Sequence, residues 1–208
     1  MTANAAARAG KPPREHRSFT LGVVAGTTPG KWVRIWGERM PRVPCRLEPL
    51  SAATQREALD RVDAALIRLP IETDGLHVIL LYDDLPVVIF PSDSHLAAAE
   101  ELEPSDLHDQ VLICPGDDVL GWRGGTPAAF DPPATTAEAI EVVGSGVGIV
   151  VAPMSLARLH HRKHVDYRPF RAGPVSTVAL AWRADRSTEL VETFVGIVRG
   201  RTARSSRT

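Results

Sequence analysis

Residues 63–70 are DAALIRLP, and residues 75–90 are GLHVILLYDDLPVVIF. Both runs are apolar, rich in β-branched residues and bounded by Pro, Asp or Gly, which is typical of buried strands. The second run is too long for one strand in one sheet, and Asp83, Asp84 and Pro86 interrupt its middle. We therefore expect a strand, a crossover and a second strand that enters another lobe.

Arg68 places a charge at the end of the first of these strands. Ligands of open α/β sheets bind at the carboxyl ends of the strands, so this position is a candidate binding site. A buried Arg is costly unless it is paired, and it should therefore meet a carboxylate. That carboxylate belongs either to a ligand or to the protein, where Glu72 or Asp74 would be the partner.

The rest of the chain alternates predicted strands and helices. The β-α-β-α-β order of residues 19–69 implies parallel strands joined by right-handed crossovers. Strands are expected at 19–25, 45–50, 62–69, 87–90, 111–114, 147–152, 165–170 and 175–182. Helices are expected at 29–40, 52–59, 96–102, 136–143, 154–161 and 187–199. Their predicted caps are Thr27 or Thr28, Ser51, Ser92 or Ser94, Thr135 or Thr136, and Ser187.

The predicted architecture is α/β with two lobes and two hinge crossings, because the strand at 175–182 fits back into the first lobe. Lobe I then comprises residues 18–84 plus 175–199, and lobe II comprises residues 85–174. Residues 1–17 and 200–208 are rich in Ala, Pro, Ser, Thr and Arg, and we expect them to be disordered basic tails.

Charge and composition narrow the class of protein. The net charge of −1 combines a net +3 over residues 1–17, a net +4 over residues 199–208 and a net −8 over the body between them. An acidic body does not attract nucleic acid, so direct DNA binding is not expected, although the basic tails leave it open. The sequence shows no secretory h-region and no apolar run of the ~18 residues that a membrane span needs, and its two cysteines lie far apart. These features favour a cytoplasmic protein.

Several segments together resemble the effector-binding (substrate-binding) domain of LysR-type transcription regulators. The resemblance covers about residues 18–199 and is fairly specific in the order and spacing of its motifs. The segments that carry it are FTLGV at 19–23, Met40-Pro41, LDRVDAAL at 59–66, DSHLA at 93–97, Leu107 in a turn, and VVGSGVGIVVAP at 142–153.

This resemblance implies the two-lobed type 2 periplasmic-binding-protein fold, with a small molecule held between the lobes. It also implies a homodimer in which the helix over residues 32–40 takes part, although Trp32 and Trp36 could equally be core residues. The family's winged helix-turn-helix and linker helix are absent from these 208 residues. Arg61 stands about where the family has a Gly, and His95 lacks the following Pro.

Candidate ligand-binding residues lie at the expected strand ends. The turn before the first helix offers backbone N–H groups and hydroxyls to a small anion, as does the start of the second helix. Lobe II should add the tip of its strand at 111–114 and the Gly-rich turn after the helix at 136–143. The candidates are Gly26, Thr27, Thr28, Leu50, Ser51, Arg68, Pro115, Ser145 and Gly146.

Other motifs favour no alternative chemistry. The stretch at 25–32 fails as a P-loop, because Ala25 and Trp32 stand at the required Gly and Ser/Thr positions. Gly144-Ser-Gly146 is not a nucleophile elbow, and the His residues at 160–164 have cationic neighbours instead of acidic or Cys ligands. We find no catalytic set, no metal site and no cofactor motif.

The function predicted from the sequence is therefore non-enzymatic binding of a small organic anion, coupled to transcription regulation. The domain would act as a stand-alone sensor or through a LysR-type regulator as partner. The alternative is an enzyme on the same bilobed fold that acts on a small carboxylate.

Overall fold

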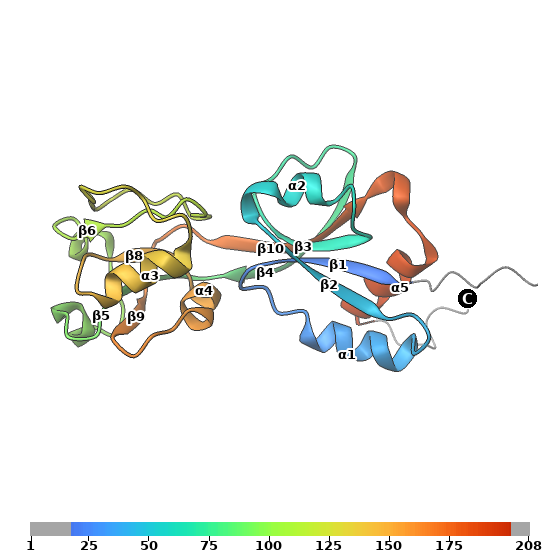
Figure 1. Ribbon diagram of the computed structural model, residues 1–208, viewed down its shortest axis with the longest axis horizontal. Coiled ribbons are helices and arrows are strands. Elements are labelled where there is room, and N and C mark those ends of the chain that lie inside the picture. Colours follow the sequence, from blue (N-terminus) through green and yellow to red (C-terminus); the bar gives the residue numbers. More distant parts are fainter. Residues whose placement is uncertain (1–17, 201–208) are drawn as a thin grey trace, which may run out of the picture.

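The computed structural model describes residues 18–200, so the predicted tails at 1–17 and 201–208 lie outside the described residues. The elements form two lobes connected by two long strands (Figure 1). This arrangement confirms the predicted α/β fold class with two lobes and two crossings.

Lobe I is built on a five-stranded sheet in the order β2-β1-β3-β10-β4. β1 pairs in parallel with both β2 and β3, whereas β10 runs antiparallel to β3 and β4. The late strand β10 therefore lies between two strands that precede lobe II in the sequence. The strands are β1 (Phe19–Val24), β2 (Cys45–Leu50), β3 (Ala64–Arg68), β4 (Leu76–Asp84) and β10 (Ser176–Arg183).

Two helices, α1 (Gly30–Arg39) and α5 (Glu189–Val198), pack on one face of this sheet. Trp36 of α1 stacks on Phe19, with ring centroids 4.6 Å apart, and Phe19 in turn stacks on Phe194 of α5 at 5.0 Å. Trp36 is thus a core residue, and Trp32 is partly buried against the same core. The other face packs against η1 (Ala52–Thr54), α2 (Gln55–Ala58) and the following residues Leu59 and Val62. A further short 3₁₀ helix, η4 (Ala184–Arg186), precedes α5.

Lobe II contains a three-stranded antiparallel sheet in the order β8-β5-β9 and a small parallel pair, β6 with β7. α3 and α4 cover the larger sheet through one apolar cluster. The strands are β5 (Pro86–Pro91), β6 (Val111–Leu112), β7 (Thr126–Pro127), β8 (Val150–Pro153) and β9 (Val165–Pro169). The helices are η2 (His95–Ala98), η3 (Pro104–Asp106), α3 (Thr136–Gly144) and α4 (Met154–Leu159).

Several predicted boundaries and caps are wrong. Neither Thr27 nor Thr28 caps α1, because Pro29 occupies the cap position and the Thr27 hydroxyl donates to the Val24 carbonyl instead. Thr188, one residue after the predicted Ser187, caps α5. The Ser187 hydroxyl instead accepts a hydrogen bond from the Trp182 indole.

In lobe II several predicted elements are longer than the observed ones, although β5 and α3 extend beyond their predicted residues. The helix expected at 96–102 is a short 3₁₀ turn, because Leu102 leaves it to pair with Phe170. The strand expected at 111–114 ends at Leu112, and the strand expected from Val147 begins only at Val150. Gly146 and Gly148 adopt positive φ angles of 90° and 63°, so this turn extends further than expected.

Candidate functional site

The strand ends of lobe I face lobe II across a cleft made of two adjoining cavities of about 250 and 580 Å³. Both cavities are lined by Ala52, Ala53, Arg68, Gly116, Asp117 and Val119. We call the two together the strand-tip cleft. The larger cavity reaches the ends of β1 and β2 through Val24, Ala25, Leu50 and Ser51, and the start of α3 through Ala134 and Thr135.

The polar groups of lobe I in this cleft are fixed by local capping. Ser51 accepts a hydrogen bond from the Ala53 N–H at 3.2 Å, because it precedes the 3₁₀ helix η1. On the lobe II side, Thr135 caps α3 by accepting from the Glu138 N–H at 3.2 Å. Hydroxyls from both lobes therefore face one cavity whose other walls are largely apolar.

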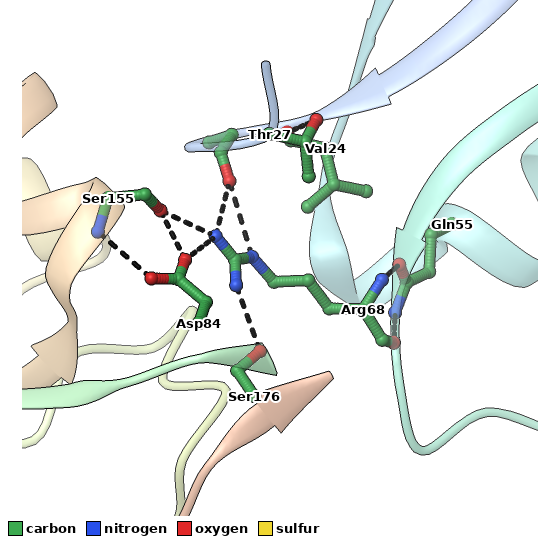
Figure 2. A network of polar contacts seen from close by, with 8 residues as sticks. Val24, Thr27, Gln55, Arg68, Asp84, Ser155 and Ser176 are labelled. Carbon is green, nitrogen blue, oxygen red and sulfur yellow. Dashed lines mark hydrogen bonds and ion pairs between the residues drawn. The ribbon is translucent and has the colours of Figure 1, made fainter. Parts of the chain in front are cut away.

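Arg68, at the end of β3, is enclosed by protein groups, and its side chain is 1% exposed. Its guanidinium donates to Asp84 Oδ2 at 2.9 Å, to Ser176 Oγ at 2.9 Å and to Ser155 Oγ at 2.9 Å, as Figure 2 shows. It also donates to the Ala25 carbonyl at 3.2 and 3.3 Å. The carboxylate partner is therefore Asp84 instead of the expected Glu72 or Asp74.

These contacts, which we call the Arg68 network, join every part of the hinge. Asp84 ends β4 and Ser176 begins β10, so the guanidinium touches both crossings. Ser155 belongs to α4 of lobe II, and its backbone N–H and hydroxyl both donate to the Asp84 carboxylate. The network is thus a direct polar contact between the two lobes.

The backbone of Arg68 is held as firmly as its side chain. The Gln55 amide donates to the Arg68 carbonyl at 2.8 Å and accepts from its N–H at 2.9 Å, and the Gln55 residue is buried. The end of β3 is therefore fixed between α2 and the hinge. Gln55 is not among the candidates predicted from the sequence, because it shows no pattern beyond its position on an expected helix.

Asp117 is a second carboxylate in the strand-tip cleft. Its Oδ1 accepts hydrogen bonds from the Thr136 N–H at 2.6 Å and the Thr136 hydroxyl at 2.7 Å. Thr136 is the first residue of α3, so the carboxylate sits at the positive end of this helix. The adjacent Asp118 instead pairs with Arg123 at 2.6 Å.

The residues predicted to bind ligand occupy separate places. Leu50, Ser51 and Arg68 line the strand-tip cleft. Pro115 is buried beside it but outside its lining. Gly26, Thr27 and Thr28 line a different cavity of about 640 Å³, the hinge pocket, on which Asp84, Leu85, Ser155 and Leu159 also border. Ser145 and Gly146 line a third, about 350 Å³ in volume, with Ser92, Asp93 and His164.

The remaining reactive groups of the described chain are poorly suited to chemistry. Burial, with a smaller contribution from Asp63, raises the pKa of Cys45 to about 11, and burial also raises the pKa of Cys114. Burial and the nearby Arg162 lower the pKa of His160. Among residues 18–200 no group of three or more His, Cys, Asp or Glu is placed to hold a metal ion. None of the helices described there is long and apolar enough to cross a membrane.

Comparison with known proteins identifies the family. Residues 14–203 match the LysR substrate binding domain. The Hca operon transcriptional activator HcaR of Escherichia coli (strain K12) is 26% identical over 219 residues, which cover 96% of this chain and 73% of that protein. A probable hydrogen peroxide-inducible genes activator of Mycobacterium avium is 32% identical over 133 residues, or 57% of this chain and 42% of that protein.

Solved structures show the same fold. The reduced OxyR regulatory domain from Pseudomonas aeruginosa superimposes with a TM-score of 0.68 at 25% identity, covering 88% of this chain and 97% of that one. The BenM effector binding domain with its effector benzoate gives a TM-score of 0.73 at 18% identity, covering 92% of this chain and 95% of that one. The family match spans nearly the whole chain, which therefore belongs to the LysR substrate-binding domain family, the effector-binding part of LysR-type transcription regulators.

Proposed function

We propose that the protein is a non-enzymatic sensor whose small-molecule effector binds in the strand-tip cleft. The observation that carries this proposal is the composition of the cleft, to which both lobes contribute at the carboxyl ends of three sheet strands. The larger cavity, at about 580 Å³, falls within the range usual for small-molecule sites. Ser51 and Thr135 would orient the ligand from opposite lobes.

Ligand binding would be reported by a change in the relative arrangement of the two lobes. A ligand that touches both lobes stabilises the arrangement in which it makes both sets of contacts. The Arg68 network lies directly beside the cleft and joins the lobes, so it sets the energy of that arrangement in the absence of ligand. Arg68 itself remains a predicted ligand contact, and such a contact would need one of its present partners to give way.

The experiment is a thermal-shift screen of the purified protein against organic acids, amides and amines. A ligand present at about 100 times its dissociation constant adds roughly 2.7 kcal/mol to the free energy of unfolding. The variant Ala53→Trp fills the cleft from an exposed position on η1 and should abolish the shift given by any hit. Ala98→Trp is the matched control, since Ala98 is exposed on a similar 3₁₀ turn in lobe II and lines no part of the cleft.

Hits that survive Ala53→Trp unchanged would show that binding occurs elsewhere. A screen without any hit, using wild-type protein whose folding is verified by circular dichroism, would contradict the sensor proposal and favour a domain kept for contacts with other proteins.

The family resemblance implies a homodimer in which the helix over residues 32–40 takes part. We propose that the hinge pocket is a further contact between two copies of the chain. Leu85 and Leu159 border this pocket and are 56% and 57% exposed, which is unusual for two neighbouring leucines. A LysR-type regulator could occupy the same surface. Leu159→Glu should convert a dimer into a monomer in sedimentation velocity, whereas Phe130→Glu, at an exposed apolar residue in a distant loop, should not.

Oxidation of a cysteine thiol fits this chain less well as the sensed signal than binding of a small molecule does. The M. avium relative is named as a probable activator of hydrogen peroxide-inducible genes, and sensing peroxide through a thiol needs a reactive thiolate. Burial raises the pKa of both Cys45 and Cys114, so little thiolate exists at neutral pH. Ligand binding therefore fits these residues better than oxidation.

A further inference from the structure

The cation of the strand-tip cleft is already neutralised by the protein. Among the described residues that line the two cavities, Arg68 is the only Lys or Arg. Its guanidinium is paired with Asp84 and bonded to two hydroxyls, and only 1% of its side chain is exposed. An acidic ligand would have to displace a buried ion pair, and separating such a pair leaves a buried charge uncompensated.

The second positive feature of the cleft is the start of α3, and a protein carboxylate occupies it as well. Free N–H groups and the helix dipole make a helix N-terminus attractive to anions. Here the Thr136 N–H already donates to Asp117 Oδ1, and Thr135 accepts from the Glu138 N–H two positions further on. The chain's own Asp117 thus fills the place that an acidic ligand would take.

The balance of charge on the cleft surface is therefore negative. Both hydrogen bonds that Asp117 accepts within the described chain fall on Oδ1, which leaves Oδ2 for another donor. No described Lys or Arg forms an ion pair with Asp117, whereas Asp84 and Asp118 each have an Arg. Asp117 acts to raise the pKa of the nearby His160, but burial and Arg162 outweigh it and lower that pKa, so His160 compensates the charge of Asp117 poorly.

We propose that the strand-tip cleft selects a non-acidic small molecule that presents an N–H donor, best as an ammonium or amide group, to the carboxylate of Asp117. The inference rests on the proposed function, since it names the class of effector for the same cleft. It replaces the organic anion expected from sequence.

The expected selectivity follows from how Asp117 interacts with a donor group and with a ligand carboxylate. A hydrogen bond from an ammonium or amide to a carboxylate is charge-assisted and roughly twice as strong as one between neutral groups. A ligand carboxylate at the same place meets a like charge in a cleft with largely apolar walls, where repulsion is weakly screened. The donor end of the ligand would lie at Asp117, and its apolar body would pack along Val24, Leu50 and Leu156. The benzoate of BenM is acidic, but at 18% identity that likeness shows the fold alone.

The test compares probes that differ only in their polar group: benzylamine, benzamide and benzoate, with the corresponding n-butyl compounds as a second set. Isothermal titration of the wild-type protein should give amine or amide affinities at least tenfold above those of the acid of the same set. Asp117→Asn keeps an oxygen for the Thr136 N–H, so α3 stays capped. This variant should lose at least tenfold in amine affinity and no longer discriminate against the acid.

Asp118→Asn is the matched control, because Asp118 also lines the cleft but is already paired with Arg123. It should leave the order of affinities unchanged. Tightest binding of the acids in the wild-type protein, or a preference that Asp117→Asn does not alter, would overturn the assignment of ligand class while leaving the sensor function intact. If no probe and no compound of the wider screen binds the folded protein, both proposals fail together.

Discussion

A single buried cation connects both hinge crossings with lobe II. Arg68 reaches Asp84, Ser155 and Ser176, which belong to the first crossing, lobe II and the second crossing. The need of Arg68 for a carboxylate was predictable from the sequence, because its neighbours are those of a buried strand. The partner, Asp84, was not predictable, since that pairing depends on how β4 crosses the end of β3.

Asp84→Asn should lower the free energy of unfolding by about 3–5 kcal/mol, because removing one member of a buried ion pair leaves the other charge uncompensated. Urea denaturation followed by circular dichroism measures the change. Asp83→Asn is the control: Asp83 is exposed, and within residues 18–200 its side chain accepts a hydrogen bond only from the Thr177 hydroxyl, so its loss should cost less than about 1 kcal/mol.

A double variant separates charge from packing. Arg68→Met combined with Asp84→Leu removes both charges and keeps similar volumes, so it should regain most of the stability that Asp84→Asn loses. An Asp84→Asn protein as stable as the wild type would show that water reaches the Arg68 network and solvates the guanidinium.

At the scale of elements, strands were predicted more accurately than helix ends. β2 spans the predicted residues, and β1, β3 and β10 differ from prediction by at most two residues at either end, because continuous apolar runs bounded by Pro, Asp or Gly mark buried strands clearly. The residue that caps a helix was harder to predict where two hydroxyl residues lie close together in the sequence. Thr135 and Ser94 cap as one of the predicted alternatives, whereas Thr27 and Thr28 do not cap α1 at all.

The candidate site was predictable only in part. Leu50, Ser51 and Arg68 face the strand-tip cleft because the ends of neighbouring strands share one edge of a sheet. The turn at Gly26–Thr28 opens to the other side of the hinge, and Ser145 and Gly146 lie at a different cavity. Asp117 lies in a Gly- and Pro-rich segment with no periodic pattern, so its approach to α3 depends on tertiary structure alone.

The predicted cap that is confirmed, Thr135, can be compared directly with a predicted cap that is wrong, Thr28. Thr135→Ala should lower the free energy of unfolding by about 1 kcal/mol, because the Glu138 N–H loses its acceptor. Thr28→Ala should change it by less than about 0.5 kcal/mol, since Thr28 is exposed and caps nothing. Chemical denaturation of both variants decides the matter, and equal losses would mean that Thr28 does cap α1 in solution.

At the scale of the whole molecule, two strands and one polar network determine how the lobes are placed. β4 leads into lobe II and β10 leads back, and the Arg68 network spans the point where they cross between lobes (Figures 1 and 2). Within that network, Ser155 supplies the contacts of lobe II, whereas Ser176 bonds Arg68 from within the sheet of lobe I.

Ser155→Ala should therefore broaden the distribution of lobe arrangements, because it removes hydroxyl contacts to both Arg68 and Asp84. Spin labels at the exposed positions Lys31 and His161, in a background without Cys45 and Cys114, report the distance between lobes by double electron–electron resonance. Ser176→Ala removes one bond to Arg68 without removing a contact from lobe II, and the distribution should keep its wild-type width. Equal widths for all three proteins would place the control of lobe arrangement outside the network.

The position of β10 in the sheet also dictates an order of events on the ribosome. β3 and β4 emerge early, but the strand that belongs between them arrives only after every strand of lobe II has been synthesised. Until then β3 has one unpaired edge and β4 has no partner strand, and unpaired strand edges of this kind pair with other chains. Lobe II can close its own three-stranded sheet in the meantime. The lobe that is begun first is thus the lobe that is completed last.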